Sequence, residues 1–123
     1  MAEKTKILII DDMPSHLLLL RTILEEDGFE VITSENGENA LQSLKNDKAV
    51  ELILLDIMMP EFDGFDFLDK INEIETIKMP VIVVSAKSDN TSIQKAIDKG
   101  AYDYLTKPFN IQDIRNKVKS ALG

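Results

Sequence analysis

Short, uninterrupted hydrophobic runs recur along the chain and alternate with segments of helical periodicity. Four runs are clear and a fifth is weaker: Ile7 to Ile10, Val31-Ile32 within Glu30 to Ser34, Leu52 to Leu55, Val81 to Val84, and a segment around Tyr102 to Thr106. Continuous runs, in contrast to alternating polar and apolar residues, are typical of strands that are buried on both faces of a parallel sheet. The pattern therefore predicts five such strands.

The segments between the runs carry apolar residues at three- and four-residue spacing, which predicts five amphipathic helices. The first begins at Pro14 and ends before Gly28, asparagine or glycine at 36–37 begins the second, Ser88 or Asp89 caps the fourth, and Asn110 caps the fifth. Their predicted buried faces are Leu17, Leu20, Ile23 and Leu24; Ala40, Leu41 and Leu44; Phe65, Leu68, Ile71 and Ile74; Ile93, Ala96 and Ile97, with Gly100 as the stop; and Ile111, Ile114 and Val118.

Strict alternation of strands and helices predicts a doubly wound α/β fold, in which right-handed crossovers place helices on both faces of a parallel sheet. A chain of 123 residues without linker, repeat or low-complexity tract suits one domain over residues 1–123. The start at Met1 and the end just after the fifth helix favour a stand-alone protein over a domain of a larger kinase or regulator.

Composition narrows the cellular setting and the chemistry. No apolar run approaches the roughly 20 residues that cross a bilayer, and the first six residues lack the apolar stretch of a signal peptide, so we expect a cytoplasmic protein without a membrane partner. The absence of cysteine excludes disulfides, thiolate metal sites and cysteine nucleophiles.

Charge is distributed unevenly along the chain. The net charge of −8 argues against direct nucleic-acid binding, which requires clustered Lys and Arg. Residues 87 to 123 nevertheless carry 7 basic against 4 acidic side chains, whereas residues 1 to 86 carry 7 against 18. The basic last third is either an ordinary solvated surface or a surface for an acidic partner.

Polar residues that could bind a ligand or react follow four of the five predicted strands. They are Asp11 and Asp12 after the first, Asp56 after the third, Ser85 after the fourth, and Thr106-Lys107-Pro108 after the fifth. Carboxyl ends of parallel strands share one edge, which is where ligands bind in open sheets. Three acids there would repel one another without a cation, and an all-oxygen ligand set indicates Mg²⁺ (or Mn²⁺).

A divalent cation and a lysine beside a carboxylate are the groups needed to position and neutralise a phosphoryl group. Aspartate can itself accept phosphate covalently. The chain contains the motifs Ile9-Ile10-Asp11-Asp12, Leu55-Asp56-Ile57-Met58-Met59-Pro60, Asp63-Gly64, Val84-Ser85-Ala86, Gly100-Ala101 and Lys107-Pro108-Phe109. On these motifs it resembles, over nearly its whole length, the receiver domains of two-component signalling, including the single-domain chemotaxis receivers.

The resemblance implies a role for each matching residue. Asp56 matches the phosphoacceptor, and Lys107 the residue that pairs with phosphoryl oxygens. The metal ligands are then Asp12 directly, Asp11 through water, Asp56, and the backbone carbonyl of Met58. The resemblance also implies a cis Lys107-Pro108 bond and a flavodoxin-like sheet in the strand order 2-1-3-4-5.

The same resemblance implies a switch and its partners. Ser85 matches the switch hydroxyl, commonly Thr in the family, and Tyr104 matches the aromatic residue that turns inward when that hydroxyl moves toward the phosphate. The donor is a histidine kinase or phosphotransfer protein, and a downstream protein binds the fourth helix, fifth strand and fifth helix. A second copy of the domain is one candidate for that surface. Such a domain assists its own phosphotransfer and dephosphorylation but is not an enzyme for free substrates.

Two other functions lack residues that they would need in this sequence. A phosphohydrolase that uses aspartyl phosphate would need a second acid two residues after Asp56, where Met58 stands. A flavodoxin-like electron carrier would need a Ser/Thr/Gly-rich phosphate loop after the first strand, where Asp11 and Asp12 would repel the flavin phosphate. The only histidine, His16, is predicted to be a solvated surface residue on the first helix rather than a phosphoryl or metal ligand.

Overall fold

The computed structural model describes residues 4–59 and 63–123, in which five strands alternate with five helices. In chain order the elements are β1 (Lys6–Ile10), α1 (Pro14–Glu26), β2 (Glu30–Ser34), α2 (Gly37–Asn46), β3 (Val50–Leu55), α3 (Gly64–Asn72), β4 (Val81–Ser85), α4 (Asn90–Asp98), β5 (Asp103–Thr106) and α5 (Ile111–Leu122). All strand pairs are parallel, in the order β2-β1-β3-β4-β5. The predicted doubly wound sheet and its order are confirmed.

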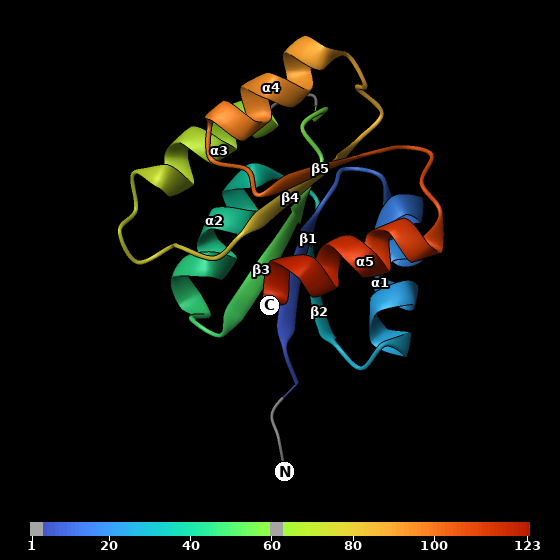
Figure 1. The fold of residues 1–123 in the computed structure, drawn as a ribbon. Coiled ribbons are helices and arrows are strands. Elements are labelled where there is room, and N and C mark those ends of the chain that lie inside the picture. Colours follow the sequence, from blue (N-terminus) through green and yellow to red (C-terminus); the bar gives the residue numbers. More distant parts are fainter. Residues whose placement is uncertain (1–3, 60–62) are drawn as a thin grey trace.

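Helices cover both faces of the twisted sheet, with α1 and α5 on one face and α2, α3 and α4 on the other (Figure 1). Alternate residues of β1 belong to opposite layers, because Ile7 and Ile9 pack with α1 and α5 whereas Leu8 and Ile10 pack beneath α2 and α3. Every residue of β4 is buried. This burial on both faces explains why the strands appear in the sequence as continuous apolar runs.

Helix boundaries follow the side chains that cap them. Asn36, Asp63, Asp89 and Asn110 each accept a hydrogen bond from a backbone amide in the first turn of their helix. Gly28 has φ +91°, the left-handed conformation expected after α1. Asp89, and not Ser88, is therefore the cap of α4, and Asn36 rather than Gly37 is the cap of α2.

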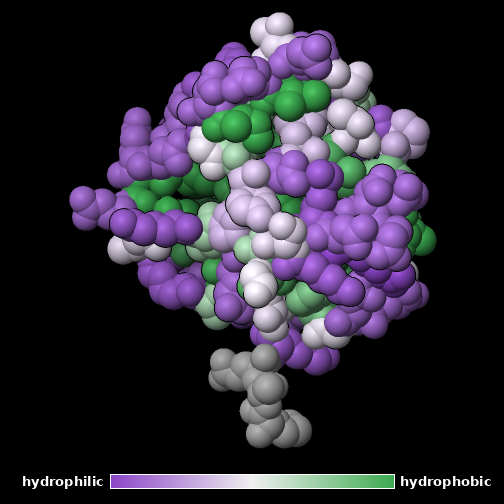
Figure 2. All heavy atoms as spheres, viewed as in Figure 1, coloured by the Kyte–Doolittle hydropathy of each residue, from purple (hydrophilic) through white to green (hydrophobic). Residues whose placement is uncertain are grey.

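Three helix-face predictions differ from the structure. Ile97 and Ile111 were expected in the core but are 40% and 48% exposed, because α4 and α5 turn them to the solvent side. Ile74 lies two residues beyond the end of α3, although it still packs against the core. Hydrophobic residues appear in patches between the mostly hydrophilic residues on the face that Figure 2 shows.

Candidate functional site

Backbone hydrogen bonds extend past the ends of the strands and fix the residues that follow them. The amide of Asp56 donates to the Ile10 carbonyl at 2.9 Å, and the amide of Asp11 donates to the Ser34 carbonyl at 3.1 Å. The amide of Lys107 donates to the Ser85 carbonyl at 2.8 Å. The residues predicted from the strand ends are therefore held at one edge of the sheet, on backbone that cannot shift independently.

The Lys107 ammonium lies between two buried carboxylates. Its Nζ is 2.7 Å from Asp11 Oδ2 and 3.1 Å from Asp56 Oδ2, although these residues are 96 and 51 positions away in the chain. The side chains of Lys107, Asp11 and Asp56 are only 12%, 2% and 9% exposed. One ammonium faces two carboxylates in a largely dry site, so the site retains a net negative charge that can attract a further cation.

The second oxygen of each buried carboxylate is fixed by its own chain. Asp56 Oδ1 accepts from the Met58 amide at 2.9 Å, and Asp11 Oδ1 accepts from the Met13 amide at 3.0 Å. Both Oδ2 atoms consequently point toward Lys107. The carboxylate of Asp56 is thus oriented before any ligand binds.

The donor atoms at this edge suit a hard divalent cation. Asp12 is half-buried and borders a surface hollow together with Met58 and Asp63, and the Met58 side chain is exposed. Carboxylate and carbonyl oxygens are the ligands that Mg²⁺ prefers. The neighbouring Pro60 of the motif lies outside the described residues.

Ser85 is the last residue of β4, Tyr104 lies within the neighbouring β5, and both are buried. The Tyr104 hydroxyl donates to the Lys87 carbonyl at 2.6 Å, and Ser85 Oγ accepts from the Lys87 amide at 3.3 Å. Burial raises the pKa of the Tyr104 phenol above its usual range, and a side-chain hydrogen bond with Ser85 partly offsets this rise. The two residues thus meet at the loop that connects β4 to α4.

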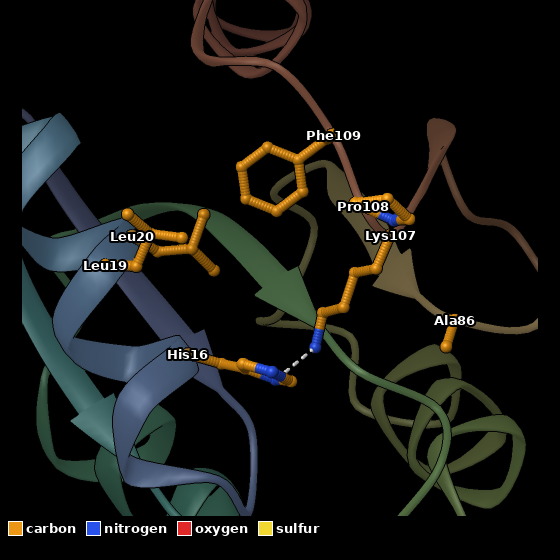
Figure 3. Close-up of a pocket in the computed structure, with 7 residues that line it drawn as sticks. All are labelled: His16, Leu19, Leu20, Ala86, Lys107, Pro108 and Phe109. Carbon is orange, nitrogen blue, oxygen red and sulfur yellow. Dashed lines mark hydrogen bonds between the residues drawn. The ribbon is translucent and has the colours of Figure 1, made fainter.

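His16 lies beside Lys107 and Asp11 in the carboxylate cluster, a position that the sequence did not predict. Its Nδ1 lies 2.7 Å from Lys107 Nζ and 3.3 Å from Asp11 Oδ2, and its side chain is 35% exposed (Figure 3). One signal was present, since residue 16 stands one turn before the buried Leu20 on the same helical face. That face at the start of α1 points to the edge where the strands end.

The Lys107-Pro108 peptide is cis, as the resemblance implied. Beside it is a cavity of about 400 Å³, lined by Leu19, Leu20, Ala86, Pro108 and Phe109, with His16 and Lys107 at one end (Figure 3).

None of the helices within residues 4–59 and 63–123 has the length and apolar character needed to cross a bilayer.

Comparisons with known proteins agree with this geometry. A family model described as the response regulator receiver domain matches residues 7–119. The alkaline phosphatase synthesis transcriptional regulatory protein PhoP of Bacillus subtilis (strain 168) is 35% identical, over 95% of this chain and 48% of its own length. The chain spans about half the length of the curated relatives it matches.

Solved structures show the same fold over nearly the whole chain. A two-component response regulator from Clostridium difficile superposes with a TM-score of 0.90 at 33% identity, covering 97% of this chain and 96% of that one. The chemotaxis protein CheY4 of Vibrio cholerae superposes with a TM-score of 0.91 at 26% identity, covering 98% of this chain and 100% of that one. The chain therefore belongs to the receiver-domain family of two-component response regulators, which are signalling switches.

Proposed function

We propose that this domain is a phosphorylation switch that accepts a phosphoryl group on Asp56. The observation that carries the proposal is the Lys107 ammonium 3.1 Å from Asp56 Oδ2, in a site where a second buried carboxylate completes the cluster. A carboxylate oxygen of Asp56 forms a bond to phosphorus while the bond from phosphorus to a histidine nitrogen of the donor breaks. Lys107 neutralises the charge on the transferred group.

A divalent cation, Mg²⁺ (or Mn²⁺), supplies further positive charge for this transfer. Asp12, Asp56 and the Met58 carbonyl are the proposed direct ligands, and Asp11 binds through water. Two features support this assignment. Asp11 Oδ2 is already engaged by Lys107, whereas Asp12 borders the open hollow beside Met58.

Phosphorylation repacks the face formed by α4, β5 and α5 through Ser85 and Tyr104. Their shared contact with Lys87 makes the loop before α4 sensitive to either hydroxyl. Two contacts join the α4 region to α3. Lys99, just after α4, pairs with Asp69 of α3 at 2.8 Å, and the Lys95 ammonium of α4 lies 4.3 Å from the centre of the Phe65 ring of α3. Displacement of this loop would therefore change the contacts that position α4.

The α4-β5-α5 face has the composition of a protein-binding surface. Ile97 of α4, Tyr102 just before β5 and Ile111 of α5 are each at least 40% exposed. The basic residues of this region are Lys95, Lys99, Arg115, Lys117 and Lys119, of which Lys99, Arg115 and Lys117 pair with acids of the chain itself. Exposed apolar side chains among mildly basic residues suit binding of a downstream protein or of a second copy of the domain rather than of nucleic acid. We place this interaction in the cytoplasm.

Mass spectrometry after incubation with acetyl phosphate and Mg²⁺ tests the phosphoacceptor. Wild-type protein should gain one phosphoryl mass, and Asp56→Asn should gain none. The same modification on both proteins would assign the phosphate to another residue and overturn the proposal.

A further inference from the structure

Three atoms that could bind a metal ion surround the Lys107 ammonium. Asp11 Oδ2, His16 Nδ1 and Asp56 Oδ2 lie 2.7, 2.7 and 3.1 Å from Nζ. The three residues each offer a ligand atom within 4.8 Å of the others. The position that the ammonium holds is therefore built to stabilise positive charge.

His16 changes the chemistry of that position. An ammonium group only donates hydrogen bonds, so the 2.7 Å contact is a hydrogen bond in the tautomer that leaves a lone pair on Nδ1 of His16. A lone pair on an imidazole nitrogen is also a metal ligand. One nitrogen with two carboxylate oxygens suits Zn²⁺, Co²⁺ or Ni²⁺ better than Mg²⁺, which prefers oxygen alone.

The two carboxylates are already oriented for such a cation. Their Oδ1 atoms accept from the Met13 and Met58 amides, which leaves both Oδ2 atoms directed at the centre of the cluster. Fixing a ligand through its second atom is how proteins orient metal-binding side chains. The cavity of about 400 Å³ beside Lys107 gives the lysine chain room to turn away (Figure 3).

We propose that Asp11, His16 and Asp56 form a binding site for a borderline divalent cation of the zinc and cobalt class, which takes the position of the Lys107 ammonium. This site shares Asp11 and Asp56 with the all-oxygen Mg²⁺ site proposed above, and it differs by using the His16 nitrogen in place of Asp12 and the Met58 carbonyl. Its consequence rests on the proposed function: a cation bound to Asp56 Oδ2 displaces Lys107 and occupies the oxygen that attacks phosphorus, so it inhibits phosphorylation.

The only histidine of the chain makes the site directly observable. Protein made without a histidine tag and with ¹⁵N-labelled imidazole is titrated with Zn²⁺ and separately with Mg²⁺, with no phosphodonor present. The Nδ1 resonance should shift with Zn²⁺ and stay in place with Mg²⁺. A Zn²⁺ titration that leaves Nδ1 unmoved overturns the proposal.

Matched variants separate the nitrogen ligand from the acids. His16→Asn offers an oxygen in place of Nδ1, and by calorimetry it should lose about tenfold or more in Zn²⁺ affinity while Mg²⁺ affinity changes by about twofold or less. Lys107→Ala should bind Zn²⁺ more tightly, because the competing ammonium is gone. An unchanged ratio of Zn²⁺ to Mg²⁺ affinity in His16→Asn contradicts the site.

Asp12→Ala distinguishes this inference from the proposed function. It should keep Zn²⁺ binding at His16 and lose Mg²⁺-dependent phosphorylation. If wild-type Asp56 accepts no phosphate, the proposed function fails while the Zn²⁺ measurements still decide the metal site. In phosphorylation assays at fixed Mg²⁺, Zn²⁺ should inhibit wild type more strongly than His16→Asn, and equal inhibition would count against the inhibitory role.

Discussion

The Tyr104 hydroxyl donates a 2.6 Å hydrogen bond to the backbone carbonyl of Lys87, and this bond links β5 to the loop after β4. The amide of the same Lys87 donates to Ser85 Oγ at 3.3 Å. One loop residue is thus held by both proposed switch side chains. Movement of either hydroxyl changes the environment of the other.

The buried Tyr104 phenol should make stability fall at alkaline pH. Burial raises the pKa of Tyr104 above the ordinary value of about 10, so the folded protein binds this proton more tightly than the unfolded chain. The stabilisation is complete below about pH 10 and is lost as pH rises from there through the folded pKa. Urea unfolding across this range should show the loss in wild type.

Tyr104→Phe should abolish that component of the pH dependence, and Tyr102→Phe is the matched control because it removes the other phenol of the chain. An alkaline slope that is the same in Tyr104→Phe and wild type would refute the assignment. At neutral pH, loss of the bond to the Lys87 carbonyl should cost about 1 kcal/mol of unfolding free energy.

Gly64 at the start of α3 should not tolerate a side chain. A Cβ at this position would meet the Cα of Ile57 and lie 2.6 Å from its Cγ2, and Ile57 directly follows Asp56. Gly64→Ala should therefore lower the free energy of unfolding by roughly 1–3 kcal/mol. It should also slow phosphorylation of Asp56, and a stability equal to wild type in urea would contradict the close contact.

The fold was predictable because parallel strands buried on both faces leave continuous apolar runs and because capping side chains mark helix starts. The exposure of Ile97 and Ile111 was not predictable from spacing alone. Helical periodicity places both on the apolar stripe, but it does not say how far each helix rolls on the sheet. Packing with neighbouring helices decides that, and neighbours are not visible in a local pattern.

The site was predicted in part, for the same reason. Strand ends converge on one edge, so Asp11, Asp56 and Lys107 could be placed together before the structure was known. His16 was missed because a lone histidine on a helix has no local signature of its partner, and Lys107 is 91 residues away. The buried leucines of α1 indicated which side of the helix His16 lies on, but not that His16 contacts Lys107.

Asp12 and Asp11 should differ in their effect on metal-dependent phosphorylation. Asp12 is proposed to bind Mg²⁺ directly, whereas Asp11 Oδ2 is engaged by Lys107. Asp12→Ala should therefore reduce the Mg²⁺-dependent rate more severely than Asp11→Ala, measured by mass spectrometry over time with acetyl phosphate. Rates in both variants equal to that of wild type would show that neither acid serves the metal.

Lys107 should be needed for the conformational change that follows phosphorylation, but not for the uptake of phosphate on Asp56. Without its ammonium, Mg²⁺ still neutralises the phosphoryl group, but no cation links Asp56 to β5. Lys107→Ala should take up phosphate and fail to show the chemical-shift changes that wild type shows around Tyr104 in two-dimensional NMR. The same shifts in variant and wild type would exclude the relay.

Phosphorylation should alter the α4-β5-α5 face more than the opposite side of the domain. Ser85, Lys87 and Tyr104 connect the carboxylate edge to the loop before α4, and Lys95 and Lys99 connect α4 to α3. Because a ligand shifts an equilibrium only by its differential affinity, a partner that prefers the repacked face must in turn stabilise the phosphorylated protein.

Amide hydrogen exchange with and without the phosphate mimic beryllofluoride measures this change directly. Protection should change within residues 85 to 120, and Asp56→Asn, which lacks the acceptor carboxylate, should show no response to the mimic. Changes confined to α1 and α2, with residues 85 to 120 unaltered, would place the output elsewhere.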